Sequence, residues 1–394
     1  MFSTARPKYR NGVRLATVLL AAAGVVSAQG PAFAAGTGTG AGAAVAARPD
    51  ATDRAALQQA LDEAVAEGVP GVVAEVRDAR GVWRTSSGVA DLADGQRARA
   101  GDRFRIGSVT KTFVATVVLQ LVAERRIGLD DPIERGLPGV VPNGGNITVR
   151  QLLSHTSGLA DYLTTLLAEP DALRSAQTSH YTPAELVAIS AKLGPQFAPG
   201  TSWAYSNTNY VVLGMLVEHV TGHRLGDEIT RRIVRPLQLA DTSFPSTADA
   251  LSGPHLHGYE WLDGPTAAPV DLTVFSPSPI WGAGTMTSTA DDLNRFYRAL
   301  FGGRLLAPGL LAQMRLPHPI DDHGRAYGLG LESRTYCANG QAAWGHSGSV
   351  AGYETFSFTT ADGRRQITFS LNRNLTAAPA VDGTITKILT LGLC

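Results

Sequence analysis

Ser108 and Lys111 are the two residues of this chain whose types and spacing point most directly to chemistry. They stand three positions apart, and residues three apart on a helix share nearly the same face. A serine hydroxyl becomes a good nucleophile when a base takes its proton, and a lysine in an apolar setting can have its pKa lowered enough to be that base. The Ser108 N–H, at the start of the helix, would point to where an oxyanion forms.

The surroundings of this pair favour a chemical role over a chance occurrence. Ser-x-x-Lys by itself also occurs on solvated helices. The segment 113–121 that follows is largely apolar, which indicates that this turn is buried. The pair therefore predicts an acyl-enzyme formed on Ser108.

A second polar group, Tyr205-Ser206-Asn207, lies between a turn-rich segment and a predicted helix. A tyrosine hydroxyl can shuttle a proton when a nearby cation favours its phenolate, and an asparagine amide can both accept from and donate to a substrate amide. The alternative is a packed tyrosine followed by helix-capping polar residues. Taken alone, the motif favours that alternative.

The third group is His346-Ser347-Gly348-Ser349, in the strand-rich C-terminal part. Gly348 would let a ligand backbone approach a sheet edge closely, Ser347 could hydrogen-bond a carboxylate, and the Ser349 N–H could be a second oxyanion donor. The alternative is a glycine-rich strand end whose histidine satisfies its own neighbours. Only the three groups together predict a site.

In this order and placement, the three groups resemble the signatures of the serine β-lactamase and penicillin-binding protein superfamily: Ser-x-x-Lys, Tyr-x-Asn, and Lys-Thr-Gly or a variant. The chain is most similar to the class C branch, which includes the secreted DD-carboxypeptidases of actinomycetes. Its His-Ser-Gly is similar to the His-Thr-Gly of the Streptomyces DD-peptidases, where class C β-lactamases have lysine. The resemblance extends from about Ala55 to Cys394.

The resemblance implies catalytic roles for four residues. Ser108 would be the nucleophile and Lys111 its base. Tyr205 would be the general base or acid for the leaving amine, and His346 would support the proton relay of Tyr205. A histidine is largely neutral at pH 7, whereas lysine gives β-lactamases a fixed charge, so His346 favours the carboxypeptidase.

The resemblance also implies binding roles. Asn207 would hold the acyl-side amide of the substrate, and Ser347 would contact its terminal carboxylate. Trp281 would line the cleft, and Arg334 would be the cationic anchor for the carboxylate.

The expected function is a secreted D-alanyl-D-alanine carboxypeptidase that acts on peptidoglycan stem peptides and is acylated by penicillin. The alternatives are a class C-like β-lactamase, an esterase, a D-stereospecific peptidase or amidase, and a non-catalytic cell-wall or penicillin sensor. The intact Ser, Lys, Tyr and Asn set counts against the sensor. The substrates would be peptides or β-lactams, and the sequence calls for no cofactor.

Other histidines are interpreted as structural. His155, in His155-Thr156-Ser157-Gly158, belongs to a stretch that is scaffold in the family. His255 and His257 form a pair without cysteine or carboxylate support nearby in the sequence, so we expect no metal site there. The chain has no Gly-x-Ser-x-Gly elbow, which argues against an ordinary α/β-hydrolase.

The N-terminal residues predict export. Four basic residues precede the apolar run 15–26, and Ala32-Phe33-Ala34 is the preferred cleavage site, with Val26-Ser27-Ala28 second. The alternative is a membrane anchor, but the run is shorter than the roughly 20 residues that a spanning helix needs. Residues 1–34 would be the signal peptide and 35–51 a flexible Gly/Ala/Thr-rich leader.

Cleavage changes the charge balance. It removes four basic and no acidic residues, so 34 basic against 34 acidic becomes 30 against 34. A mildly acidic protein has no electrostatic footprint for nucleic acid. Two cysteines in an exported chain, Cys337 and Cys394, predict one disulfide, with two unpaired thiols as the alternative.

The elements that must position these residues follow from periodicity and turn signals. Helices are predicted at 53–67, from Ser108 to a stop at Gly128, and at 148–154, 182–193, 208–221, 288–301 and 379–391, and strands at 71–77, 82–85, 327–332, 352–359 and 366–371. We therefore expect an α/β (α+β) domain at 52–394, an antiparallel sheet flanked by helices plus an all-helical lobe. The α/β lobe would comprise about 52–115 and 275–394, and the helical lobe about 116–274.

Overall fold

The structure is a computed structural model that describes residues 52–394 apart from 168–170, 246–250, 322–323, 375 and 377–379. The predicted signal peptide and leader lie outside the described residues. None of the helices described here combines the length and the hydrophobicity needed to cross a bilayer.

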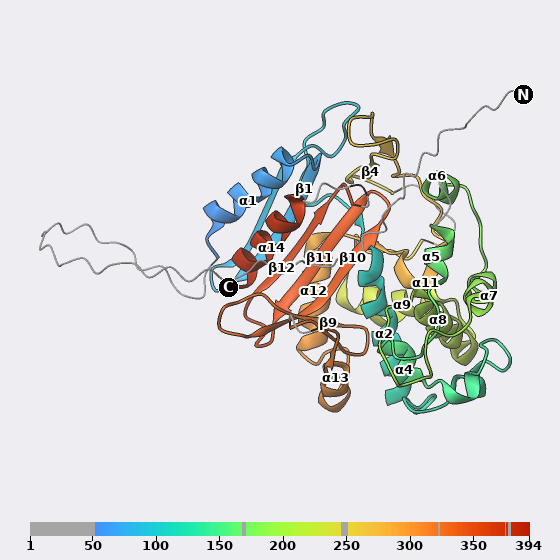
Figure 1. Ribbon diagram of the computed structural model, residues 1–394. Coiled ribbons are helices and arrows are strands. Elements are labelled where there is room, and N and C mark those ends of the chain that lie inside the picture. The colour runs from blue at the N-terminus through green and yellow to red at the C-terminus, as the bar shows by residue number, and fades with distance from the viewer. Residues whose placement is uncertain (1–51, 168–170, 246–250, 322–323, 375, 377–379) are drawn as a thin grey trace, which may run out of the picture. The chain divides into compact units, whose positions relative to one another are not determined.

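One antiparallel sheet joins the two ends of the described chain (Figure 1). Within the described residues its eight strands run in the order β2-β1-β12-β11-β10-β9-β8-β7. Strand β1 pairs with its hairpin partner β2 on one side and with β12 on the other, where Val73 faces Ser370. This arrangement confirms the prediction that strands from both ends share one sheet. The strands are β1 (Gly71–Asp78), β2 (Gly81–Gly88), β7 (His318–Pro319), β8 (Ala326–Tyr327), β9 (Glu332–Thr335), β10 (Ala342–Val350), β11 (Tyr353–Thr360) and β12 (Gln366–Leu371).

Helices cover both faces of the sheet, because strands such as β1 are apolar on both sides. Val72, Ala74 and Val76 of β1 belong to one hydrophobic core and Val73 to the other. Helices α1 (Arg54–Ala66) and α14 (Ala380–Leu393) lie side by side on the first face, in front of the sheet in Figure 1, and α12 (Ala290–Phe301) packs on the second.

The helical lobe is built around two buried helices, α2 (Thr110–Ala123) and α8 (Asn207–Thr221). Helix α2 is buried from Thr110 through Leu119, so it is a core helix rather than an amphipathic surface helix. The expected stop at Gly128 was wrong. The helix ends at Ala123, and Arg125 adopts a left-handed backbone (φ 58°) that an α-helix cannot contain.

The remaining helices fall largely within the range expected for the helical lobe. They are α3 (Ile133–Gly136), α4 (Val149–Leu153), α5 (Tyr162–Leu166), α6 (Ala172–Ala176), α7 (Pro183–Leu193), α9 (Leu225–Ile229), α10 (Arg235–Leu237), α11 (Trp281–Gly284) and α13 (Pro308–Met314). Short strand pairs join β3 (Phe104–Arg105) to β6 (Thr287–Ser288) and β4 (Tyr259–Glu260) to β5 (Val270–Asp271).

One predicted strand, 327–332, is instead two short strands with a turn between them. Strand β8 ends at Tyr327 and β9 begins at Glu332. The Gly328 N–H donates to the Leu331 carbonyl (2.8 Å), and Gly330 has φ 76°. Glycine in this left-handed conformation reverses the chain, which the apolar pattern alone did not reveal.

The C-terminus is tied to the sheet by a disulfide. Cys337, which follows β9, is bonded to Cys394, the last residue, which follows α14. The bond therefore joins the loop between β9 and β10 to the helix that covers the sheet.

Candidate active site

The turn between β3 and α2 exposes one hydroxyl in an otherwise buried stretch. From Phe104 to Leu119 every residue is buried except Ser108, which is half-buried. Ser108 lies in a single 3₁₀ turn, and Lys111 lies in the first turn of α2. The sequence spacing thus places a reachable hydroxyl over a completely buried ammonium group.

Lys111 holds three hydrogen bonds, one of them to the Ser108 hydroxyl. The distances from Lys111 Nζ are 2.9 Å to Ser108 Oγ, 2.8 Å to Asn207 Oδ1 and 2.7 Å to the Ala283 carbonyl. The amide oxygen and the carbonyl can only accept hydrogen bonds. When the amine is neutral, its two N–H bonds therefore go to Asn207 and Ala283, and its lone pair faces Ser108.

Burial also gives Lys111 the pKa of a base. Loss of solvent lowers the pKa of this lysine to about 7, although the charges of Asp161 and Glu332 act in the opposite direction. At neutral pH a large fraction of the amine is therefore unprotonated and able to accept the Ser108 proton.

Tyr205 lies over the same amine. Lys111 Nζ is 4.9 Å from the centre of the Tyr205 ring. Burial raises the pKa of the Tyr205 phenol well above its usual value, while a hydrogen bond with Ser108 lowers it. The phenol is therefore neutral at pH 7 and can hold a proton beside the leaving group of an acyl transfer.

Asn207 is held between a base and an acid. Its Oδ1 accepts from Lys111, its Nδ2 donates to Asp161 Oδ2 (2.9 Å), and its backbone N–H donates to Asp161 Oδ1 (3.2 Å). Asp161 also caps α5 by accepting from the Leu163 N–H (3.1 Å). Burial raises the pKa of Asp161, and the charge of Lys111 lowers it. Asp161 is half-buried, so it reaches the site while remaining partly open to solvent.

The edge of strand β10 forms the opposite wall. Strand β9 pairs with β10 only over Ala342–Gly345, so the outer edge of residues 346–350 is left without a strand partner, whereas β11 pairs as far as Val350. A Cβ on Gly348 would lie 2.0 Å from the Ile106 carbonyl and 3.3 Å from Ser108 N. The close approach expected at Gly348 is therefore made by the chain's own backbone, because the strand packs directly on the nucleophile turn.

This contact also brings the two predicted oxyanion donors onto adjoining backbone segments. A Cβ on Gly107 would lie 2.8 Å from the Ser349 N atom, and Gly107 has φ 49°. The Ser108 and Ser349 N–H groups therefore belong to two segments in direct contact, as an oxyanion hole requires.

His346 is at the wall, but its ring nitrogens are both engaged away from Tyr205. Its Nδ1 bonds the Ser347 carbonyl, so it carries the proton, and its Nε2 accepts from the Tyr327 hydroxyl (2.9 Å). Burial lowers the pKa of His346 to about 4, although Glu332 raises it. A direct His346–Tyr205 relay is thus absent from the described contacts, and Tyr327 is the group between them.

Ser347 and Arg334 lie together, as the carboxylate-anchor prediction requires, but both are engaged with a third residue. Glu332 Oε1 accepts the Ser347 hydroxyl proton (2.7 Å), and Glu332 Oε2 pairs with the Arg334 guanidinium (2.5 Å). Arg334 in turn donates to Ser347 Oγ (3.0 Å). The charge of Arg334 is chiefly responsible for holding the pKa of buried Glu332 at about 2 against the effect of desolvation.

Trp281 was expected to line the cleft, but its ring packs against helix α8. A Cβ on Gly214 would lie 2.7 Å from Trp281 Cζ3, so the ring fills the space that this glycine leaves. The same short helix, α11, contributes to the site through the Ala283 carbonyl that accepts from Lys111.

An apolar cavity of about 350 Å³ adjoins the site at Ser349. Its walls come from α5, α6, the segment 275–280 and the end of β10. Apolar side chains that line it include Leu163, Leu166, Phe275 and Ile280. A cavity of this kind beside the nucleophile is suited to an apolar substrate side chain.

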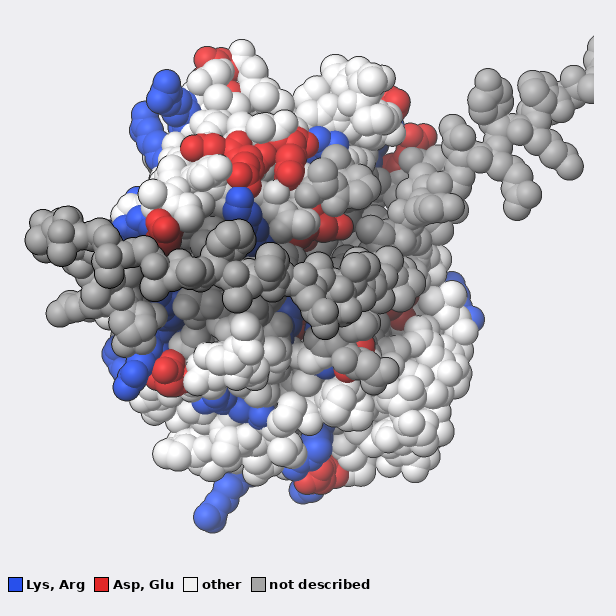
Figure 2. Space-filling model, turned by 60° about the vertical axis from the view of Figure 1, so that its left-hand side comes forward, with Lys and Arg blue, Asp and Glu red and all other residues white. Residues whose placement is uncertain are grey.

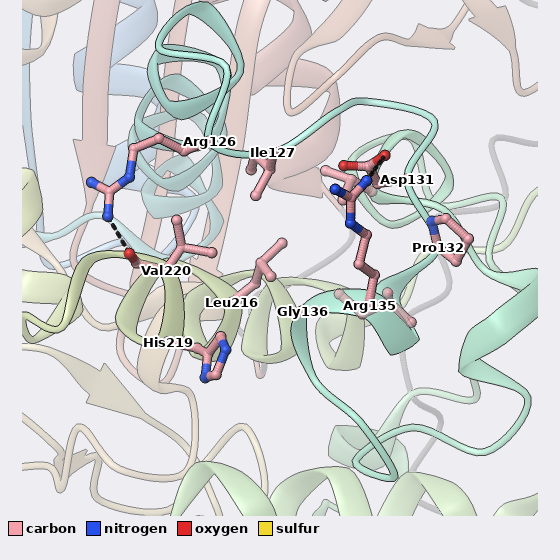
Figure 3. Close-up of a pocket in the computed structure, with 11 residues that line it drawn as sticks. Arg126, Ile127, Asp131, Pro132, Arg135, Gly136, Leu216, His219 and Val220 are labelled. Atoms are coloured by element: carbon pink, nitrogen blue, oxygen red, sulfur yellow. Dashed lines mark hydrogen bonds and ion pairs between the residues drawn. The ribbon is translucent and has the colours of Figure 1, made fainter.

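A second cavity, of about 430 Å³, lies in the helical lobe between the end of α2, α3 and α8 (Figure 3). The residues that line it include the apolar Leu216 and Ile127 and the basic Arg126 and Arg135. Among the described residues that line it, none belongs to the site around Ser108.

Among the described residues visible in Figure 2, no concentrated basic stripe is seen. Basic side chains are scattered over the face shown, and acidic ones gather in its upper part. The described residues also contain no group of three or more His, Cys, Asp or Glu side chains placed to hold a metal ion. His257 instead bonds Asp271 through Nδ1 (2.8 Å) and stacks on His255.

Four residues of the site were not identified from the sequence: His155, Asp161, Tyr327 and Glu332. His155 was assigned to scaffold, yet it lies on the Tyr205 ring with centroids 4.3 Å apart. Asp161 and Glu332 are single acidic residues without a motif, and Tyr327 is an ordinary buried aromatic in a short strand. Only their contacts with motif residues reveal them.

The buried lysine base, the half-buried serine and the strand edge across from them are the geometry of an acyl-transferring serine hydrolase. A family model described as Beta-lactamase matches residues 57–391. The chain belongs to the beta-lactamase family. This confirms the superfamily resemblance inferred from the three motifs.

Proteins similar to this beta-lactamase family member include amidohydrolases and penicillin-binding proteins. A D-stereospecific amidohydrolase from Streptomyces sp. is 39% identical, with a TM-score of 0.79 over 87% of this chain and 99% of that chain. A D-amino acid amidase from Ochrobactrum anthropi SV3, complexed with D-phenylalanine, is 28% identical, with a TM-score of 0.75 over 86% and 98%. Penicillin-binding protein 4* of Bacillus subtilis is 26% identical over 302 residues, 74% of this chain and 65% of that protein.

Proposed function

We propose that this chain is a D-stereospecific serine amidohydrolase that cleaves the amide bond on the carbonyl side of a D-amino acid with an apolar side chain. Neutral Lys111 takes the Ser108 proton as Oγ bonds to the amide carbonyl carbon. The carbonyl oxygen then carries the negative charge beside the Ser108 and Ser349 N–H groups. The C–N bond breaks as the leaving nitrogen takes a proton delivered through Tyr205 and Lys111, and water hydrolyses the remaining ester.

The observation that carries this proposal is the orientation of the Lys111 amine. Its two carbonyl-type acceptors, Asn207 Oδ1 and the Ala283 carbonyl, leave only the direction of Ser108 for the lone pair. Burying a lysine costs free energy, because its charged form loses contact with water. A lysine that only filled space would therefore not be expected here, directed at a half-buried hydroxyl.

The electrostatics of the wall favour a substrate without a terminal carboxylate. A hydroxyl has one proton to donate, and Ser347 donates it to Glu332. The positive charge of Arg334 is paired with the same carboxylate. Across the site Asp161 provides a half-buried acid next to Asn207, which suits the ammonium group of a free amino acid amide or peptide.

The side chain and configuration of the substrate follow from the cavity and from the relatives. The apolar cavity at Ser349 suits a bulky apolar side chain. The 39% identical relative from Streptomyces sp. is a D-stereospecific amidohydrolase, which supports the D configuration for this chain.

A second candidate is the D-alanyl-D-alanine carboxypeptidase predicted from the sequence. It is favoured by the contact of Arg334 with Ser347 at the open edge of β10, where a terminal carboxylate would arrive. A peptidoglycan substrate also requires a location outside the cell, and the proposal of a secreted enzyme rests on the export signal predicted in residues 1–34.

The two functions are separated by hydrolysis of matched substrates. D-Phe-p-nitroanilide and L-Phe-p-nitroanilide have a free ammonium group, whereas diacyl-Lys-D-Ala-D-Ala has a terminal carboxylate. We expect the D-anilide to be hydrolysed and the L-anilide to react at least about 100-fold more slowly. Ser108→Ala should abolish the hydrolysis of both anilides. Release of D-alanine from the peptide, without hydrolysis of the D-anilide, would select the carboxypeptidase. Rapid turnover of a cephalosporin chromophore or a simple ester would instead select a β-lactamase or an esterase.

Glu332→Gln tests the charge argument in the same assays. The variant keeps the shape of the side chain but leaves Arg334 without its anionic partner. If carboxylate binding is blocked by this pair, KM for the carboxylate-ended peptide should fall about 10-fold or more, because a hydrogen bond to a charged group contributes roughly 1.5–3 kcal/mol. KM for the D-anilide should change little. An unchanged KM for the peptide would contradict the charge argument.

A further inference from the structure

His155 is a completely buried histidine that the proposed reaction does not use. Its side chain is 0% exposed, and its backbone is left-handed, with φ 61°. Few residues other than glycine adopt this conformation, although histidine does so more often than most. A strained, buried and polar residue beside the nucleophile turn therefore calls for an explanation.

The contacts of His155 fix which of its nitrogens carries the proton. Nδ1 faces two donors, the Ser206 N–H (3.2 Å) and Asn209 Nδ2 (3.0 Å). Asn209 must present Nδ2, because its Oδ1 accepts from the Ser157 hydroxyl (2.6 Å). Nδ1 is therefore an acceptor without a proton, and Nε2 carries the proton of a neutral ring.

The second ring nitrogen, Nε2, is buried and has no hydrogen-bond partner among the described residues. Aromatic rings surround the imidazole instead: Tyr205 at 4.3 Å, Tyr327 at 4.7 Å and Tyr210 at 5.3 Å between centroids. A histidine enclosed in this way is not a proton carrier, so its function must lie in what it holds.

What His155 holds is the peptide on both sides of Tyr205. Its carbonyl accepts from the Ala204 N–H (3.1 Å), and its Nδ1 accepts from the Ser206 N–H (3.2 Å). Its ring lies against the Tyr205 ring at an angle of 31°. One residue from the loop after α4 therefore contacts three consecutive residues of the segment that leads into α8.

We propose that His155 is a positioning residue that sets the place of the Tyr205 phenol relative to Ser108 and Lys111. This inference rests on the proposed function, because it assigns Tyr205 a part in proton transfer. Among the hydrogen bonds of the described residues, the N–H groups of Ala204 and Ser206 donate only to His155. Displacement of the phenol by even a fraction of an ångström would slow the chemical step more than it weakens substrate binding.

The test compares two substitutions that separate the acceptor from the ring. His155→Asn keeps an acceptor, because Asn Oδ1 stands the same number of bonds from the backbone as His Nδ1, and asparagine tolerates positive φ. His155→Phe keeps the ring but leaves the Ser206 and Asn209 donors without a partner. We expect kcat per acylatable site to fall about 10- to 100-fold in the Phe variant, with KM within about threefold, and to stay within about fivefold of wild type in the Asn variant.

Active-site counting by a fluorescent fluorophosphonate, which labels serine nucleophiles and has no carboxylate, separates positioning from folding. A purely structural role would lower the number of sites that become labelled without changing kcat per labelled site. That result, or an Asn variant as impaired as the Phe variant, would overturn the proposal. Loss of labelling in Ser108→Ala checks the proposed nucleophile independently, so a failure of the proposed function is recognised separately.

A double-mutant cycle identifies Tyr205 as the residue through which His155 acts. If His155 acts by positioning the phenol, its substitution by Phe should have little further effect on the acylation rate in a Tyr205→Phe background. Additive effects would contradict the proposal. If the His155→Phe chain does not fold, the same cycle can be measured with Asn209→Ala, which removes one of the two donors to Nδ1 and should show the same coupling to Tyr205.

Discussion

The protonation state of Lys111 controls how the rate of acylation should depend on pH. The proposed reaction needs the neutral amine, whose lone pair faces Ser108. Because burial brings the pKa of this lysine to about 7, the rate constant for acylation should rise about tenfold per pH unit from pH 5 to 6.5. It should level off above about pH 8.

The lowered pKa distinguishes Lys111 from a lysine in water. With a pKa of about 7, roughly half of the amine is neutral at pH 7, one-tenth at pH 6 and one-hundredth at pH 5. A solvated lysine with a pKa of 10.5 would be neutral in only about 3 molecules of 10,000 at pH 7, and its activity would continue to rise to pH 10. The pKa of His346, about 4, and the raised pKa of Tyr205 both lie outside the range from pH 5 to 8 in which the rate should change.

The assay is single-turnover modification of Ser108 in the full chain by a fluorescent fluorophosphonate, which reacts with the same nucleophile and has no carboxylate, between pH 5 and 10, with circular dichroism to show that the fold is retained. Lys111→Arg is the matched control, because arginine stays charged throughout this range, and it should react at least about 1,000-fold more slowly at pH 8. A rate constant that is flat from pH 5 to 8, or one that still rises tenfold per unit from pH 8 to 10, would refute the assignment of Lys111 as base.

Three further predictions concern packing and stability. Gly348→Ala should slow acylation at least about tenfold, because its Cβ would lie 2.0 Å from the Ile106 carbonyl, whereas Gly383→Ala on α14, where no atom lies within 4 Å, should leave activity unchanged. Replacing both Cys337 and Cys394 by Ser should lower the free energy of unfolding by about 4 kcal/mol in denaturant melts, since the bond closes a loop of 57 residues. On folding, the pKa of Lys111 falls from 10.5 to about 7, so the unfolded chain binds more protons between these values. The buried lysine costs roughly 5 kcal/mol below pH 7, and this cost diminishes as the pH rises from 7 to 10.5. Lys111→Met should therefore gain stability relative to wild type by about 3 kcal/mol more at pH 6 than at pH 9 in urea unfolding; equal gains would contradict the depressed pKa.

The elements of the fold were largely predictable, because they depend on local patterns. Apolar residues at four-residue intervals predicted α1, and two apolar runs around a glycine turn predicted the β1–β2 hairpin. The boundaries that failed were those that a single left-handed residue decides. Arg125 ends α2 early, and Gly330 divides the strand expected at 327–332.

The sequence by itself determined the reacting pair and the family. Ser108 and Lys111 are three residues apart, so a single turn of chain brings them together whatever the rest of the molecule does. The Tyr205 and His346 motifs could be identified because their order and residue types resemble a known family.

Only the tertiary structure decided how these groups are charged and held. His155 and Asp161 lie between α4 and α5 and Glu332 begins β9, and no motif in the sequence assigned any of the three to the site. Their effects on the pKa of Lys111, on the Ser347 proton and on the Tyr205 segment exist only at distances of a few ångströms. Electrostatic and hydrogen-bonding interactions depend on such distances and on burial, neither of which is written in the order of the residues.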